Sequence, residues 1–181
     1  MTEPAQQQND EQPRVDPTKG DAVAHLAAVI GAANYPARDR AMLRRWVPDQ
    51  PVPLSFYRLW LRHLDSDLPS EQQTEAWMTI AWGLAVLGAD SHEPKRPLGQ
   101  ALSESGFSEG RLERLLSSPD DVRTDLFMSA IRFLAAHRER FNWREGAWFL
   151  LTGDSDKRER IHRRIAKAFY RYLPKDSNAK E

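Results

Sequence analysis

Apolar side chains recur at intervals of three and four residues along almost the whole chain after residue 18, and this helical spacing constrains the fold most strongly. A long helix, for example, is predicted where Trp77, Ile80, Leu84 and Leu87 share one face and Gly88 ends the pattern. No segment alternates apolar and polar residues as a strand does, and no hairpin dipeptide or repeat of fixed period is present. The sequence therefore predicts an all-α protein of about nine helices.

Two polar segments indicate how these helices are divided. Residues 1–18 have no apolar periodicity and are predicted to form a disordered tail, because they cannot bury enough surface to offset the entropy of ordering. The loop ADSHEPKRP at 89–97 is predicted to separate an N-terminal helical subdomain at 19–90 from a C-terminal one at 91–175, with a flexible end at 176–181. We expect two small helical bundles packed side by side.

The composition excludes several classes of protein. There is no cysteine among the 181 residues, so disulfides, thiolate metal ligands and thiol catalysis are ruled out. No run approaches the ~20 apolar residues of a membrane-spanning helix, and the acidic, Gln-rich N-terminal segment does not resemble a signal or transit peptide. We expect a soluble, cytoplasmic protein without membrane contact.

The charges balance over the whole chain but are segregated along it. The 26 basic and 26 acidic residues give a formal net charge of zero. Residues 157–175 nevertheless contain eight Lys or Arg and a single Glu, and residues 37–46 contain four Arg and one Asp. Residues 1–20, by contrast, contain four acidic and two basic residues. The two basic segments are the first indication of function, because clustered cations are typical of proteins that bind polyanions.

The last predicted helix, from about residue 154 to residue 172, carries two parallel stripes. Its apolar stripe consists of Ile161, Ile165, Ala168 and Tyr172. Its cationic stripe consists of Lys157, Arg160, Arg164, Lys167 and Arg171. The cations are either a solvated helix face or a binding surface for a polyanion, whose phosphates would turn their mutual repulsion into attraction. Solvated faces normally mix the two signs of charge, and this one does not, which favours a polyanion.

The second basic segment has the same two interpretations. Arg38, Arg40, Arg44 and Arg45 lie on a short predicted helix, and cations at the C-terminal end of a helix also favour its dipole without any ligand. Trp46 follows directly and is the one tryptophan that we single out as a stacking platform for bases. The other five tryptophans lie among aliphatic residues at helical spacing and are predicted to pack in the core or in an interface.

No pattern of catalytic or metal-binding residues rises above background. The five histidines are scattered and form no tight metal-ligand motif, and the nine glycines form no phosphate-binding loop. Serines and acidic residues are plentiful, but nothing points to a catalytic triad. We therefore predict no cofactor, no metal and no enzymatic activity.

Four segments resemble a known family, the small subunit (CasB) of the type I-E CRISPR Cascade surveillance complex. They are SFYRLW at 55–60, PLGQALSESGFSEGRLERLL at 97–116, AIRFLAAHRERFNW at 130–143 and DKRERIHRRIAKAFY at 156–170. The run LGxALxxSG, followed by a capped helix of Leu and Arg, is the most specific part. The resemblance covers roughly residues 20–172, matches only as a generic helix and loop between 65 and 95, and leaves out the acidic tail.

The resemblance implies an all-α, non-catalytic protein of two small bundles, present in two copies per complex. Such a protein would contact the backbone and large subunits and help to hold the guide RNA (crRNA), the target strand and the displaced strand. The basic positions that match those of the family are Arg45, Arg132 and Lys157, with the neighbouring Arg44, Arg158 and Arg160. Arg132 is singled out by the resemblance alone.

The stripes and the resemblance together predict a subunit that binds the nucleic-acid backbone without reading bases. Its predicted contact residues are Arg38, Arg44, Arg45, Arg132, Lys157, Arg158, Arg160, Arg164 and Lys167. The alternative is a structural adaptor, in which the basic stripes dock on acidic protein surfaces and the tryptophans form the interface. The sequence alone leaves open whether the basic segments meet in space.

Overall fold

The computed structural model describes residues 17–174 and confirms the all-α prediction. The described residues form nine helices and no strand. The helices are α1 (Pro17–Gly31), α2 (Ala37–Arg45), α3 (Leu54–His63), α4 (Glu71–Leu87), α5 (Leu98–Glu104), α6 (Glu109–Leu116), α7 (Asp120–Ala136), α8 (Trp143–Leu151) and α9 (Ser155–Tyr172). None of them is both long and apolar enough to cross a membrane. Residues 17 and 18 of the predicted tail belong to α1, whereas residues 1–16 and the predicted flexible end lie outside the described residues.

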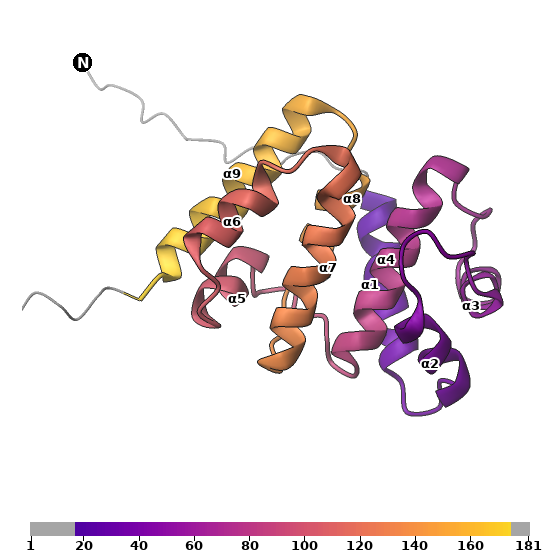
Figure 1. Cartoon of the computed structure of the whole chain (residues 1–181). Helices are drawn as coiled ribbons and strands as arrows, with labels where there is room; N and C mark the ends of the chain where they lie inside the picture. Colours follow the sequence, from indigo (N-terminus) through magenta and orange to yellow (C-terminus); the bar gives the residue numbers. More distant parts are fainter. Residues whose placement is uncertain (1–16, 175–181) are drawn as a thin grey trace, which may run out of the picture.

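Helix α4 lies where the N-terminal and C-terminal helices meet (Figure 1). It packs against α1 and α2 and also against α7 and α8, while α9 lies along α5. Buried residues from Val23 in α1 to Phe169 in α9 form one continuous hydrophobic cluster, so the core joins both halves of the chain. The division into subdomains near residue 90 stays a prediction, and an arrangement of two bundles is not confirmed.

The polar loop between α4 and α5 is tied to the segment between α7 and α8. The Glu93 amide donates to the Phe141 carbonyl at 3.0 Å, and the Asn142 amide donates to the Arg96 carbonyl at 2.7 Å. The Arg96 guanidinium also pairs with Glu139. The loop that marks the predicted boundary is therefore held by residues more than forty positions further along the chain.

Three helices begin at a capping side chain that satisfies an otherwise unpaired backbone amide. Ser108, Asn142 and Asp154 are the N-caps of α6, α8 and α9, and each side-chain oxygen accepts from an amide two or three residues further on. In α9, the Lys157 amide donates to Asp154 at 2.8 Å. The Asp154 carboxylate also interacts favourably with the positive end of the helix dipole. Local chemistry thus fixes where α9 begins.

Helix α5 approaches α9 so closely that position 99 has no room for a side chain. A Cβ placed on Gly99 would lie 2.1 Å from the Ile165 carbonyl oxygen. Gly106 follows α5 with a φ of 79°, a conformation that glycine adopts without steric cost. There the Phe107 amide donates to the Leu102 carbonyl at 2.9 Å in a Schellman turn. The two glycines of the LGxALxxSG run therefore serve two different structural needs.

The buried face of α9 differs from the predicted stripe at its C-terminal end. Ile161, Ile165 and Ala168 are buried as predicted, but Tyr172 is 41% exposed. Phe169 is fully buried in its place, because it lies one helical turn after Ile165 on the same side of the helix. The prediction that Tyr172 belongs to the buried stripe is wrong.

Replacing Gly99 by Ala should destabilise the protein by about 1–3 kcal/mol, because the added methyl group forces α5 away from the α9 backbone. The matched control is Gly110→Ala in α6, where a Cβ meets no atom within 4 Å. That variant should be as stable as the parent or slightly more stable, since alanine restricts the unfolded chain. Urea unfolding measures both, and equal midpoints would contradict the close packing of α5 on α9.

Candidate nucleic-acid interface

Helix α9 has three faces with different chemistry. The first consists of the apolar residues that pack against α5 and α8. At 3.6 residues per turn, the five cations of the predicted stripe fall on a second face. The third face is directed toward α6, and its residues line a groove between the two helices. The buried face fixes the orientation of α9 and therefore also fixes where its cations point.

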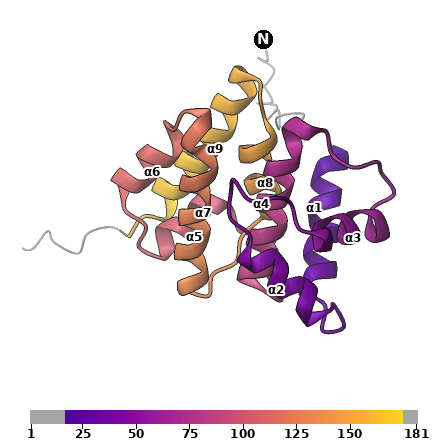
Figure 2. The same cartoon turned by 45° about the vertical axis from the view of Figure 1, so that its right-hand side comes forward.

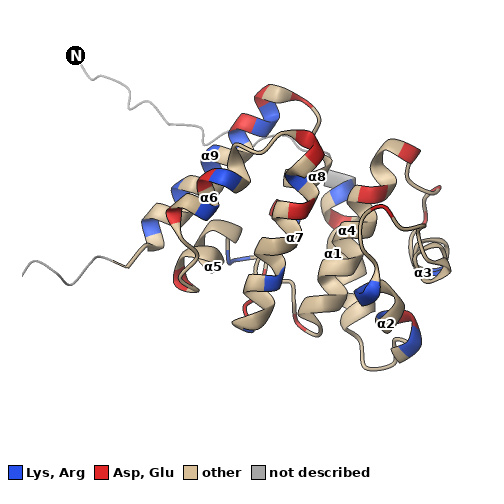
Figure 3. Cartoon of the chain, viewed as in Figure 1, with Lys and Arg blue, Asp and Glu red and all other residues tan. Residues whose placement is uncertain are grey.

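Most cations of the predicted stripe are exposed and unpaired. Lys157, Arg160, Lys167 and Arg171 are exposed, and none of them forms a salt bridge with an acidic residue in the described part of the chain. Figure 3 shows the basic residues that follow one another along α9. No carboxylate between residues 17 and 174 lies within salt-bridge distance of these four cations, and the nearest acidic residue in i,i+4 register is Asp156, before Arg160.

Arg164, in the middle of the stripe, is engaged with the protein itself. Its Nε donates to Oε1 of Glu145 in α8 at 2.9 Å, and its guanidinium lies over the ring of Trp148. Glu145 is only 1% exposed, and its Oε2 accepts from the Leu98 amide at the start of α5 at 2.7 Å. Burial raises the pKa of Glu145, and the bonds from Leu98 and Arg164 act in the opposite direction. One carboxylate thus joins α5, α8 and α9.

Arg158 is also engaged within the protein. Its guanidinium pairs with Asp120, at the start of α7, at 3.0 Å and donates to the Thr152 carbonyl at 3.4 Å. Asp120 is also 3.5 Å from Arg123, which is buried with its guanidinium over the Phe149 ring. Arg158 therefore fastens the first turn of α9 to α7, although two arginines share a single, largely exposed carboxylate.

The basic segment of α2 contains both free and engaged arginines. Arg38, Arg44 and Arg45 are exposed and have no salt bridge within residues 17–174. Arg40 instead donates to main-chain carbonyls at the end of α1, including that of Ile30 at 2.9 Å. These bonds satisfy carbonyls that the end of a helix leaves unpaired. Arg40 therefore has a structural role, and the other three arginines are available to a ligand.

Trp46 is not a free stacking platform. Its side chain is 4% exposed, and its indole nitrogen donates to the Gln50 carbonyl at 3.2 Å. The interpretation of Trp46 as a base-stacking residue is therefore wrong. Four other tryptophans are buried, as the core prediction requires: Trp60, Trp77, Trp82 and Trp143. Trp148 is half-buried beneath Arg164.

Arg132 links α7 to α4 through an aromatic ring. Its side chain is exposed, and its guanidinium carbon lies 5.1 Å from the centroid of the Trp82 ring. This distance allows a cation–π attraction, which restricts the guanidinium without neutralising its charge. Arg132 therefore presents a positive charge where the N-terminal and C-terminal helices meet.

The basic residues do not form one continuous patch. Helix α2 packs on α3 and α4, whereas α9 packs on α5 and α8, and two views place α2 and α9 at opposite sides of the molecule (Figures 1 and 2). Helix α7, which carries Arg132, lies between them. We define the α9 surface as Lys157, Arg160, Lys167 and Arg171, and the α2 surface as Arg38, Arg44 and Arg45. The structure answers the question that the sequence leaves open: the two surfaces are separate.

Two features of this region escape prediction from the sequence. The first is the pairing of Arg164 with Glu145, since the two residues are nineteen positions apart and no local spacing signals it. The second is the groove between α6 and α9, for which the only signal is the pair of like charges, Glu109 and Glu113, one helical turn apart. Within residues 17–174, no three His, Asp or Glu side chains gather as metal ligands.

Comparison with known proteins identifies one family. A family model described as CRISPR-associated protein Cse2 matches residues 39–170. This span contains every residue of the two cationic surfaces except Arg38 and Arg171, which lie just outside its two ends. Searches of curated proteins and of solved structures gave no match.

Replacing Arg164 by Ala should lower the free energy of unfolding by about 1–3 kcal/mol at neutral pH, because the buried Glu145 carboxylate loses a charged donor. Lys167→Ala is the matched control, since Lys167 lies on the same face, is exposed and has no salt bridge. It should change stability by less than about 0.5 kcal/mol. Urea unfolding distinguishes the two substitutions.

The effect of Arg164→Ala should also depend on pH. Without the guanidinium, the pKa of Glu145 rises further above its ordinary value of 4.5, so the folded variant takes up its proton at a higher pH than the parent does. The loss of stability should therefore shrink as the pH falls and the buried carboxylate becomes neutral in both proteins. A loss of the same size at pH 4 and pH 8 would contradict a role for the ion pair.

Proposed function

Because the chain belongs to the CRISPR-associated Cse2 family, the small (CasB) subunits of the type I-E Cascade complex, we propose that it is a non-catalytic subunit that binds nucleic-acid backbone through its two cationic surfaces. The family match confirms the resemblance found in the sequence, and the family is one of structural Cascade subunits. In that complex the chain would stabilise the target strand, the displaced strand and the guide RNA.

The free cations of α9 carry this proposal. Lys157, Arg160 and Lys167 are exposed, unpaired among the described residues and fixed in line by the buried face of the helix. Ten residues of α-helix span about 15 Å, which corresponds to roughly four phosphates of one strand at about 3.4 Å each. A row of this length suits several successive phosphates. Binding would also relieve the repulsion among the cations, none of which forms a salt bridge with a described carboxylate.

The proposed contacts are to the backbone and not to the bases. An RNA-guided complex obtains sequence specificity from base pairing, so its protein subunits need only charge and shape at the strand. Five of the six tryptophans are buried and the sixth lies beneath Arg164, so no tryptophan is free to stack on bases. The lack of a free tryptophan favours sequence-independent binding, and the exposed aromatic residues of α9, Tyr170 and Tyr172, lie outside the row of free cations.

The separation of the two surfaces favours two distinct nucleic-acid contacts in place of one. The α9 surface would engage one strand, and the α2 surface would engage another stretch of crRNA or target DNA. Arg132 would lie between the two surfaces. Contacts with the backbone and large subunits, and with a second copy of the chain, would place these surfaces along the strands. The alternative remains a structural adaptor whose cations meet acidic protein surfaces.

The test is the salt dependence of target-DNA binding by the assembled complex. Lys157→Ala and Arg45→Ala should each reduce the magnitude of the slope of log affinity against log salt by about 0.7–0.9, the value for one phosphate contact. Both residues are exposed, so neither variant should change the thermal midpoint of the chain. Target-DNA retention should fall much more than guide-RNA content.

Arg114→Ala in α6 is the control, because Arg114 is an exposed arginine outside both surfaces. It should leave the slope unchanged. If Lys157→Ala and Arg45→Ala also leave the slope unchanged while the complex assembles normally, nucleic-acid binding is the wrong function for these cations. If the two substitutions instead prevent assembly, the adaptor function is correct.

A further inference from the structure

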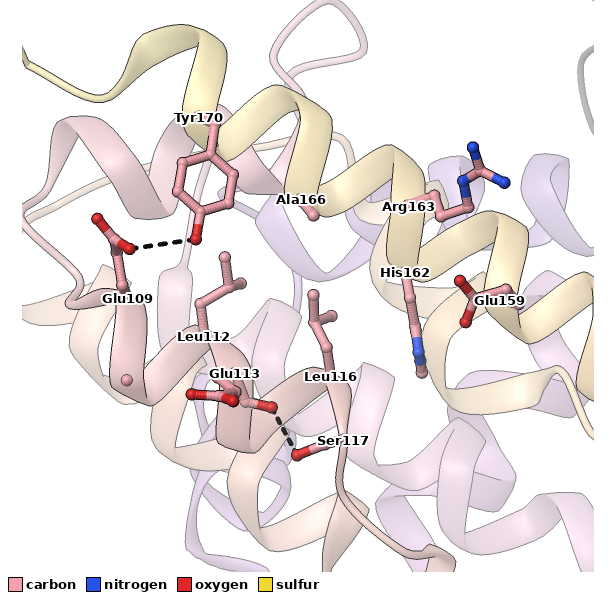
Figure 4. A pocket seen from close by; sticks show the side chains of 11 residues that line it. Glu109, Leu112, Glu113, Leu116, Ser117, Glu159, His162, Arg163, Ala166 and Tyr170 are labelled. Carbon is pink, nitrogen blue, oxygen red and sulfur yellow. Dashed lines mark hydrogen bonds between the residues drawn. The ribbon is translucent and has the colours of Figure 1, made fainter.

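A groove of about 640 Å³ lies between α6 and α9, on the third face of α9 (Figure 4). Leu116 of α6 and Ala166 of α9 are partly exposed and, with the exposed ring of Tyr170, give it an apolar lining, whereas Leu112 is buried. At one end Tyr170 of α9 donates to Glu109 of α6 at 3.2 Å. The volume lies within the range of about 300–1,000 Å³ that is typical of ligand-binding pockets, so the groove can accept several side chains of a partner.

The polar groups of the groove are mainly acidic. Glu109, Glu113 and Glu159 are exposed along it, against the single cation of Arg163. None of the three carboxylates forms a salt bridge within residues 17–174. Burial lowers the pKa of His162, which is therefore neutral at pH 7 and adds no positive charge. The groove thus combines apolar surface with unpaired negative charge.

This chemistry is opposite to that of the neighbouring α9 surface. Phosphates would be repelled by Glu113 and Glu159, so a nucleic acid held on the cationic face would not extend into the groove. A segment that buries apolar side chains on Leu116 and the Tyr170 ring and places Lys or Arg near the glutamates would satisfy both features. Helix α9 therefore separates a cationic surface from an acidic groove.

We propose that the groove between α6 and α9 binds a protein segment that carries basic and apolar side chains at helical spacing, supplied by a different subunit of the complex. The apolar lining provides the area to be buried, and the three carboxylates select the charge of the partner. The groove would then anchor the chain through protein contact while the α9 surface remains free for nucleic acid. This inference does not depend on the nucleic-acid proposal, because it concerns another face of the helix.

Gly110 offers a direct test. It lines the groove, and a Cβ placed on it meets no atom within 4 Å, so a side chain can project from it without a clash. Gly110→Lys would place a positive charge in the groove, Gly110→Glu a negative charge, and Gly110→Gln a neutral side chain of similar length. Because position 110 lies in the first turn of α6, the thermal midpoint of each variant is measured to separate effects on the helix from effects on binding.

The probe is a fluorescent twelve-residue peptide of Leu and Lys at helical spacing, with a Leu and Glu peptide as its counterpart. The Lys peptide should bind the purified chain, Gly110→Lys should weaken that binding at least tenfold relative to Gly110→Gln, and Gly110→Glu should keep or strengthen it. The Glu peptide should not bind. Asp121→Lys and Asp125→Lys, on exposed positions of α7 outside the groove, should leave binding of the Lys peptide unchanged.

The same variants are then compared in the reconstituted complex. Gly110→Lys should reduce the retention of a neighbouring subunit. Among the complexes that do assemble, the slope of log DNA affinity against log salt should be the same for Gly110→Lys as for Gly110→Gln. Equal peptide binding by Gly110→Lys and Gly110→Glu, or a preference for the Glu peptide, would overturn the proposal. A photo-crosslinker at position 110 that captures guide RNA, or a second copy of this chain, in place of another subunit would overturn it as well.

Discussion

The carboxylate of Glu145, in α8, lies buried between α5 and α9 and accepts a hydrogen bond from each of these two helices. One oxygen accepts from the Leu98 amide at the start of α5, and the other accepts from Arg164 of α9. A carboxylate with 1% exposure is tolerated only when such donors replace water, so the stability of α8 in this position depends on both α5 and α9. Gly99, next to Leu98, brings the α5 and α9 backbones into contact, and therefore the ionic and steric constraints act at the same junction.

This junction determines what each face of α9 presents to the surroundings. Because Ile161, Ile165 and Phe169 are fixed against the core, Lys157 and Lys167 project together on one face, and the residues facing α6 line an acidic, apolar groove on another. Arginines of the same helix consequently have different roles. Arg164 and Arg158 maintain the fold through Glu145 and Asp120, whereas the free cations remain for a ligand. Charge alone does not distinguish these roles, but a carboxylate partner within the fold does.

The sequence predicts the helices and the stripes of α9 well, because both depend on local spacing and capping. It predicts the buried face of α9 except at Tyr172, since Phe169 and Tyr172 are both aromatic and only tertiary packing selects between them. It does not predict that Arg164 is paired, because Glu145 is close in space and distant along the chain. It also cannot show that the α2 and α9 surfaces are separate, since their relative position is set by contacts of both helices with other elements.

We propose that α9, held in place through Glu145, presents its free cations to nucleic-acid phosphates. An experimental structure of the complete complex with target DNA tests it most directly, through the distances from the side-chain nitrogens of Lys157, Arg160 and Lys167 to the nearest phosphate oxygens. We expect distances of about 4 Å or less for at least two of these residues, with Arg164 still bound to Glu145. Lysines and arginines of α9 paired with carboxylates of a protein neighbour, and no phosphate within reach, would contradict it.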